Sequence, residues 1–124
     1  ERTDSIDILY FVDRLEIPDI YFDSHFYIVP ERKGLKPFFL FLEALDQTGL
    51  VAIGTFVMRE KEYMCAVEPY EDGLLLSTLN YAYEIRPMER IAALKKAPKL
   101  EKNEVALAIQ LIDKMTKKKF DISK

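Results

Sequence analysis

The chain has 124 residues, 49% of them hydrophobic and 31% charged, as expected of one globular domain with a single core. Its lone cysteine, Cys65, excludes an internal disulfide and fits a reducing compartment, and no run reaches the roughly 18 apolar residues of a membrane helix. Residues 1–85 carry 7 Lys and Arg against 16 Asp and Glu, a difference of −9, whereas residues 86–124 carry 11 against 5, a difference of +6.

The first 34 residues predict two short strands. Residues 5–12 are rich in Ile, Tyr, Phe and Val, which favour strands, and residues 25–30 form a second strand closed by Pro30. Between them, Pro18 and several acids indicate a turn or a short helical link, and residues 31–34 read as a turn.

Residues 35–48 predict an α-helix. Pro37 suits its first turn and Gly49 suits the position just past its end. One apolar stripe has helical spacing, and it comprises Leu35, Phe38, Phe39, Leu42 and Leu45. Further apolar residues surround much of the helix, so we expect it to be buried on more than one side or to face a partner.

Two strands apolar on both faces follow at residues 50–58 and 62–69, joined by the charged tip Arg59-Glu60-Lys61-Glu62. A turn at residues 70–73 leads into a third strand at 73–79. In the first of these strands the apolar residues alternate, with Val51, Ile53 and Val57 on one side and Ala52, Phe56 and Met58 on the other.

The C-terminal part begins after Pro87. The segment between Pro87 and Pro98 has a helical composition, and residues 100–117 predict an amphipathic helix with Val105, Ile109 and Ile112 on its apolar face. This helix either packs on the chain's own strands or extends as an arm, and the two prolines favour the arm. The lysines of this part either attract a polyanion or are simply solvated.

The sequence offers little for catalysis. His25 is the only histidine, and it either acts as a base or only satisfies local hydrogen bonds. Cys65 has no basic neighbour in sequence and reads as an inert buried thiol. The acids Asp4, Asp7, Asp13, Glu16, Asp19 and Asp23 are scattered, and the glycines form no phosphate loop. We expect no enzyme, no catalytic residue, no metal and no cofactor.

Several segments in order resemble the core domain of the Ku family, the DNA-end-binding proteins of non-homologous end joining, in its prokaryotic homodimeric form. They are "IPDIYFD", "FYIVP", "KPFFLFLEALDQTGLVAIGTFVMREKEYMCAVEP", "GLLLSTLNYAYEIR" and "EVALAIQLIDKMTKKKFDISK". The resemblance covers nearly the whole chain; no single piece is diagnostic, but the ordered series is specific.

The resemblance implies an α+β fold, mainly antiparallel β: a partial β-barrel with one packed helix and a C-terminal helical arm. Residues 1–86, including helix 35–48, would form the barrel portion, and residues 87–124 the arm of the same domain. Two subunits would form a ring on a double-stranded DNA end, catalyse nothing, need no cofactor and recruit a DNA ligase. We expect a cytoplasmic, nucleoid-associated protein with no membrane partner.

Two features depart from the family pattern. Its core has an N-terminal section with further strands and a strap across the DNA, which this chain lacks; since the chain begins with Glu1, we expect a processed or trimmed piece with an open sheet edge. Family members also often have basic residues where this chain has Leu42, Leu50, Thr55 and Glu68, which weakens the case for DNA contact along that face.

The remaining cations are the candidates for phosphate contact: Lys33, Lys36, Arg59, Lys61, Arg86 and Arg90. Each of them is otherwise a solvated surface charge. The candidates for a dimer interface are Val105, Ile109, Ile112 and Leu42. An alternative function is that of a SPOC-like protein-interaction domain, which resembles the Ku barrel and would bind an acidic or phosphorylated peptide.

Overall fold

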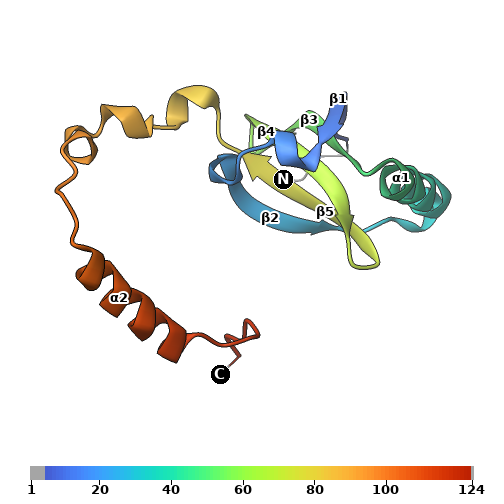
Figure 1. Ribbon diagram of the computed structural model, residues 1–124. Coiled ribbons are helices and arrows are strands. Elements are labelled where there is room, and N and C mark those ends of the chain that lie inside the picture. The colour runs from blue at the N-terminus through green and yellow to red at the C-terminus, as the bar shows by residue number, and fades with distance from the viewer. Residues whose placement is uncertain (1–4, 124) are drawn as a thin grey trace. The chain divides into compact units, whose positions relative to one another are not determined.

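The computed structural model describes residues 5–123, and the chain divides into two compact units, residues 1–86 and 87–124 (Figure 1). The described strands all lie in the first unit and are β1 (Asp7–Asp13), β2 (Phe22–Ile28), β3 (Leu50–Met58), β4 (Lys61–Tyr70) and β5 (Gly73–Leu79). They form one antiparallel sheet in the order β1-β3-β4-β5-β2. The predicted fold class is confirmed, and within residues 5–123 the sheet is open, with β1 and β2 at its edges.

Short 3₁₀ turns make the link between β1 and β2, as the sequence predicts. They are η1 (Arg14–Glu16) and η2 (Asp19–Tyr21). The Asp13 carboxylate caps η1 by accepting a hydrogen bond from the Leu15 N–H at 2.9 Å. The turn before the helix is η3 (Arg32–Gly34). Strand β2 begins at Phe22, not at residue 25, because an irregularity between Phe22 and His25 lets both residues pair with β5.

Helix α1 (Leu35–Thr48) has the predicted bounds and covers one face of the sheet (Figure 1). It ends at Gly49, whose left-handed backbone (φ 72°) lets its N–H donate to the Leu45 carbonyl at 2.9 Å. The core on this face comprises Leu45, Ala52, Phe56, Cys65, Val67, Leu74 and Leu76. The expected burial of α1 on several sides does not occur within the chain, since Phe39 is 52% and Leu40 68% exposed.

A second core lies on the opposite face of the sheet. Val51, Ile53 and Ala66 are buried there, and the partly buried residues packed against them are Val12, Ile17, Phe22, Met64 and Leu79. The alternation predicted for residues 50–58 is therefore confirmed, except that Val57 is 50% exposed. Both faces of β3 are covered, because α1 packs on one face, and Ile17 of the segment between β1 and β2 packs on the other together with Phe22.

The charged tip is a two-residue hairpin turn. Met58 pairs with Lys61, and Arg59 and Glu60 between them have φ of 54° and 63°, the pattern of a type I′ turn. Glycine or asparagine usually occupies such positions, because a Cβ makes the left-handed conformation unfavourable. The predicted turn is confirmed, with a backbone that its residue types do not favour.

The second unit contains 3₁₀ turns and one α-helix. The segment between the prolines is helical only as η5 (Met88–Arg90) and η6 (Ala92–Lys95), and α2 (Lys102–Met115) is shorter than the predicted 100–117. None of the residues of α2 is buried. In the part of the chain that the structure describes, neither helix has the length and apolarity needed to cross a bilayer.

Candidate nucleic-acid interface

The hairpin tip presents two of the predicted phosphate contacts. Arg59 and Lys61 are exposed, and neither has an ion-pair partner among the described residues. The Lys61 Nζ lies 5.2 Å from the centroid of the Tyr63 ring, a distance at which the ring attracts the cation. The tip therefore holds two free cations, and Glu60 and Glu62 beside them keep its net charge near zero.

The segment after β5 approaches the same end of the sheet. The Tyr81 hydroxyl donates to the Glu62 carbonyl at 3.3 Å, and the Tyr81 N–H donates to the Glu84 carboxylate at 2.7 Å, which fixes η4 (Ala82–Glu84). Arg86 follows two residues later and is exposed. The fold thus brings Arg59, Lys61 and the segment that carries Arg86 to one end of the sheet.

The other predicted cations lie elsewhere. Lys33 is in η3 and Lys36 is in the first turn of α1, and both are exposed without an ion pair in the described part of the chain. Arg90 ends η5 in the second unit. Among the described residues of the first unit, no hydrogen bond or ion pair links Lys33 or Lys36 to the hairpin tip.

The predicted interface residues fall into two groups. Val105, Ile109 and Ile112 lie on α2 and are 40%, 51% and 62% exposed, so this apolar stripe is available to another surface. Leu42 is half-buried and packs against the core beneath α1. Only part of the Leu42 side chain is therefore available to a second chain.

An ion pair that the sequence gave no sign of holds η1 on the sheet. The Arg14 Nε donates to the Glu68 carboxylate at 3.2 Å, Asp19 lies 3.6 Å from the same guanidinium, and the guanidinium sits 4.3 Å from the centroid of the Phe22 ring. The family resemblance leads one to expect a cation at position 68. The carboxylate of Glu68 is instead paired with the Arg14 guanidinium. The partners are 54 residues apart, so no local pattern could have revealed them.

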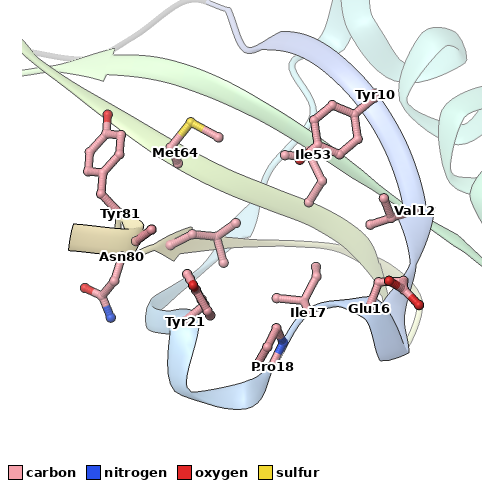
Figure 2. Close-up of a pocket in the computed structure, with 12 residues that line it drawn as sticks. Tyr10, Val12, Glu16, Ile17, Pro18, Tyr21, Ile53, Met64, Asn80 and Tyr81 are labelled. Atoms are coloured by element: carbon pink, nitrogen blue, oxygen red, sulfur yellow. The ribbon is translucent and has the colours of Figure 1, made fainter. Parts of the chain in front are cut away.

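A hollow of about 520 Å³ opens on the second face (Figure 2). Figure 2 shows Ile17 and Pro18 on one side of it and Ile53 and Met64 on the other. Its lining is mostly apolar and aromatic, and Glu16 is the sole charged group that residues 5–123 contribute to it.

The two residues considered for catalysis lie on strands of the sheet, His25 on β2 and Cys65 on β4. The Nδ1 of His25 lies 2.7 Å from the Ser77 hydroxyl, and its ring stacks on Phe22. Cys65 is fully buried, and burial raises the pKa of its thiol to about 11. Across residues 5–123, no three His, Cys, Asp or Glu side chains are grouped to hold a metal ion; Asp4 lies outside the described residues.

Comparison with known proteins gives a consistent result. A family model described as the Ku70/Ku80 beta-barrel domain matches residues 1–107. The chain is 36% identical over 122 residues to the non-homologous end joining protein Ku of Coxiella burnetii, covering 93% of this chain and 43% of the relative. The proteins of the same name from Pseudomonas aeruginosa and Archaeoglobus fulgidus are 34% and 35% identical over 117 residues, which cover 93% and 94% of this chain and 40% and 46% of theirs. The chain therefore spans less than half the length of these curated relatives.

Proposed function

The chain belongs to the Ku β-barrel domain family, and on this premise we propose that it contributes to binding double-stranded DNA ends in non-homologous end joining. The observation that carries the proposal is the match over residues 1–107, together with relatives whose names state that process. The chain would bind ends as a subunit or a fragment of a dimeric ring, as the resemblance to the family implies.

The exposed cations of the first unit, and not its net charge of −9 over residues 1–85, favour contact with phosphates and not with bases. Arg59 and Lys61 are exposed at the hairpin tip, and Arg86 is exposed in the segment that follows Tyr81, whose hydroxyl donates to the Glu62 carbonyl beside that tip. Binding through such cations does not depend on sequence, because every nucleotide carries the same phosphate. The anions Glu60 and Glu62 limit the strength of this contact.

The proposed partners follow from the second unit and from the family. The exposed stripe of Val105, Ile109 and Ile112 would pack on a second copy of the chain, since burying such a stripe removes apolar surface from water. The role is that of a non-catalytic platform, and the joining chemistry would belong to a DNA ligase that it recruits.

End binding is tested by gel shift with linear and closed circular duplexes of the same sequence. We expect the linear form to bind and the circle to bind weakly, with affinity falling steeply between about 50 and 200 mM salt. Equal binding to both forms would refute end specificity, and the complete gene product assayed in parallel would show whether the chain alone suffices.

The hairpin tip is tested by the salt dependence of the same assay. Replacing Arg59 and Lys61 by Gln should lower the slope of log affinity against log salt by about one unit for each lost phosphate contact. Glu60→Gln is the matched control, because it removes a charge from the same turn without removing a cation, and its slope should not fall. An unchanged slope in the double variant would exclude the tip from the interface.

A further inference from the structure

Two tyrosines form a stacked pair in the segment that follows β5. The rings of Tyr81 and Tyr83 have centroids 5.4 Å apart and planes 10° apart, so they are nearly parallel. Tyr83 is 83% exposed, whereas Tyr81 is half-buried. Because Tyr81 covers one face of the Tyr83 ring, the aromatic surface that Tyr83 leaves in water includes its other face.

The pair is held against an inner strand of the sheet. The Tyr81 hydroxyl donates to the Glu62 carbonyl of β4 at 3.3 Å, and the Tyr81 N–H donates to the Glu84 carboxylate at 2.7 Å. Since β4 lies between β3 and β5, this anchor involves neither of the outer strands, β1 and β2. Tyr81 is thus fixed at its backbone and at its hydroxyl, and Tyr83 stacks on a fixed ring.

Cations lie near the pair, but the local charge is balanced. Glu62, which accepts from Tyr81, directly follows Lys61 in the hairpin tip. The tip and residues 81–86 carry as many anions as cations, namely Glu60, Glu62 and Glu84 against Arg59, Lys61 and Arg86. A phosphate backbone that contacts these cations therefore gains little net attraction. A ligand that also stacks on an aromatic ring gains an attraction that does not depend on charge.

We propose that Tyr83 stacks on an unpaired base at a DNA end, while Arg59 and Lys61 contact the phosphates beside that base. The bases inside a duplex are paired and stacked on one another, whereas the bases of a single-stranded extension are free to stack on a protein ring. Every base has such a face, so the contact does not depend on sequence. The inference rests on the proposed binding of DNA ends and gives that site a preference for ends with a single-stranded extension.

Fluorescence anisotropy tests the preference on one duplex with different ends, using the complete gene product and this chain in parallel. One end is blunt, one carries a short run of unpaired thymines, and one carries abasic sites, which keep the phosphates and lack the bases. Extensions of both polarities are made. We expect the thymine extension of at least one polarity to bind about fivefold more tightly than its abasic counterpart. Equal affinity for thymine and abasic extensions of both polarities would overturn the proposal.

Substitutions localise the preference to the ring. Tyr83→Leu should remove the roughly fivefold preference and leave the affinity for the blunt duplex unchanged. Tyr83→Phe is the matched control, because it keeps the ring and loses only the hydroxyl, and its preference should persist. Since Tyr83 is 83% exposed, neither change threatens the fold. The proposal fails if Tyr83→Leu weakens blunt and extended ends equally, or if Tyr83→Phe loses the preference as well.

A spectroscopic measurement reports the stacking itself. A 2-aminopurine base in the extension loses fluorescence when it stacks, so we expect quenching by the parent and by Tyr83→Phe but not by Tyr83→Leu. Equal quenching by all three proteins would refute the contact with Tyr83.

Two further outcomes separate the alternatives. Light scattering in which Tyr83→Leu abolishes self-association, while the preference for extensions persists, would assign the ring to a second copy and overturn the proposal. Absence of binding to any of the ends would refute the proposed function, whereas equal binding of all ends would refute only the preference for extensions.

Discussion

Of the four glycines, Gly54 is the one at which the fold leaves least room for a side chain. It pairs with Ile8 across the β1–β3 ladder, and a Cβ built on it would lie 2.4 Å from the carbonyl oxygen of Asp7, 3.1 Å from the Asp7 carbonyl carbon and 3.3 Å from the Ile8 Cα. Carbon and oxygen atoms ordinarily approach no closer than about 3.3 Å. Gly54→Ala therefore requires β1 to move by roughly 1 Å, and since the obstacle is backbone, no change of rotamer can relieve it.

The cost follows from two opposing terms. Overpacking of this kind typically destabilises by about 1–3 kcal/mol. Replacing glycine by alanine also restricts the unfolded chain, which stabilises by about 0.4–1 kcal/mol. Since Asp7 is the first residue of β1, that end of the strand can open at limited cost. We expect a net loss of about 1–2 kcal/mol in the free energy of unfolding.

Urea unfolding followed by circular dichroism measures the loss, and amide hydrogen exchange should show it concentrated in β1. Gly73→Ala is the control, because no atom lies within 4 Å of its added Cβ and its φ is not positive. We expect the control to stay within about 0.5 kcal/mol of the parent. A Gly54→Ala chain as stable as the control would refute the close approach of β1 and β3.

Three further changes test other contacts. A double-mutant cycle of Arg14→Met and Glu68→Gln should give a coupling energy of about 0.5–1 kcal/mol in urea unfolding, because the ion pair is partly exposed. A coupling energy of zero would show that this ion pair does not hold η1 on the sheet. The pKa of Cys65 is raised from 9.0 to about 11, so its contribution to stability is complete below pH 9 and is lost as the pH rises toward 11. Iodoacetamide at pH 9 should accordingly modify the urea-unfolded chain much faster than the native one, and equal rates would show an accessible thiol. Replacing Arg59 by Asn and Glu60 by Gly should raise thermal stability by about 1–2 kcal/mol, since both positions have positive φ; a loss of stability would argue against the type I′ turn.

The bounds of a helix or strand could be predicted to the exact residue where glycine, proline or a turn sequence marks its ends. Helix α1 ends where Gly49 supplies a left-handed residue, and β5 begins at Gly73 after an acidic turn. Strand β2 was predicted in part only, because its start depends on an irregular pairing with Leu79, more than 50 residues away. The segment between Pro87 and Pro98 has a helical composition but forms only 3₁₀ turns, since two prolines leave too few residues for a stable α-helix.

The candidate site was less predictable than the fold. Exposure of single cations such as Arg59 and Lys61 follows from their charge, but whether they lie near Arg86 depends on the hydrogen bond from Tyr81 to Glu62, which no periodicity encodes. The Arg14–Glu68 pair and the Tyr27–Tyr70 stack are likewise contacts between segments distant in sequence. The apolar residues of α1 predict that Phe39 and Leu40 are covered, but the sequence does not indicate whether the cover comes from this chain or from a partner.

The hairpin tip combines an unfavourable backbone with a balanced set of charges. A non-glycine residue in left-handed conformation costs about 1–2 kcal/mol, which glycine avoids fully and asparagine only in part. A residue held in a sparsely populated conformation is a reason to look for a function of its side chain. If Arg59 contacts phosphate, the Asn-Gly turn should gain stability and lose affinity for linear DNA together, whereas a turn with no role would gain stability alone. The two readouts on one variant therefore decide whether the charge at this tip serves binding.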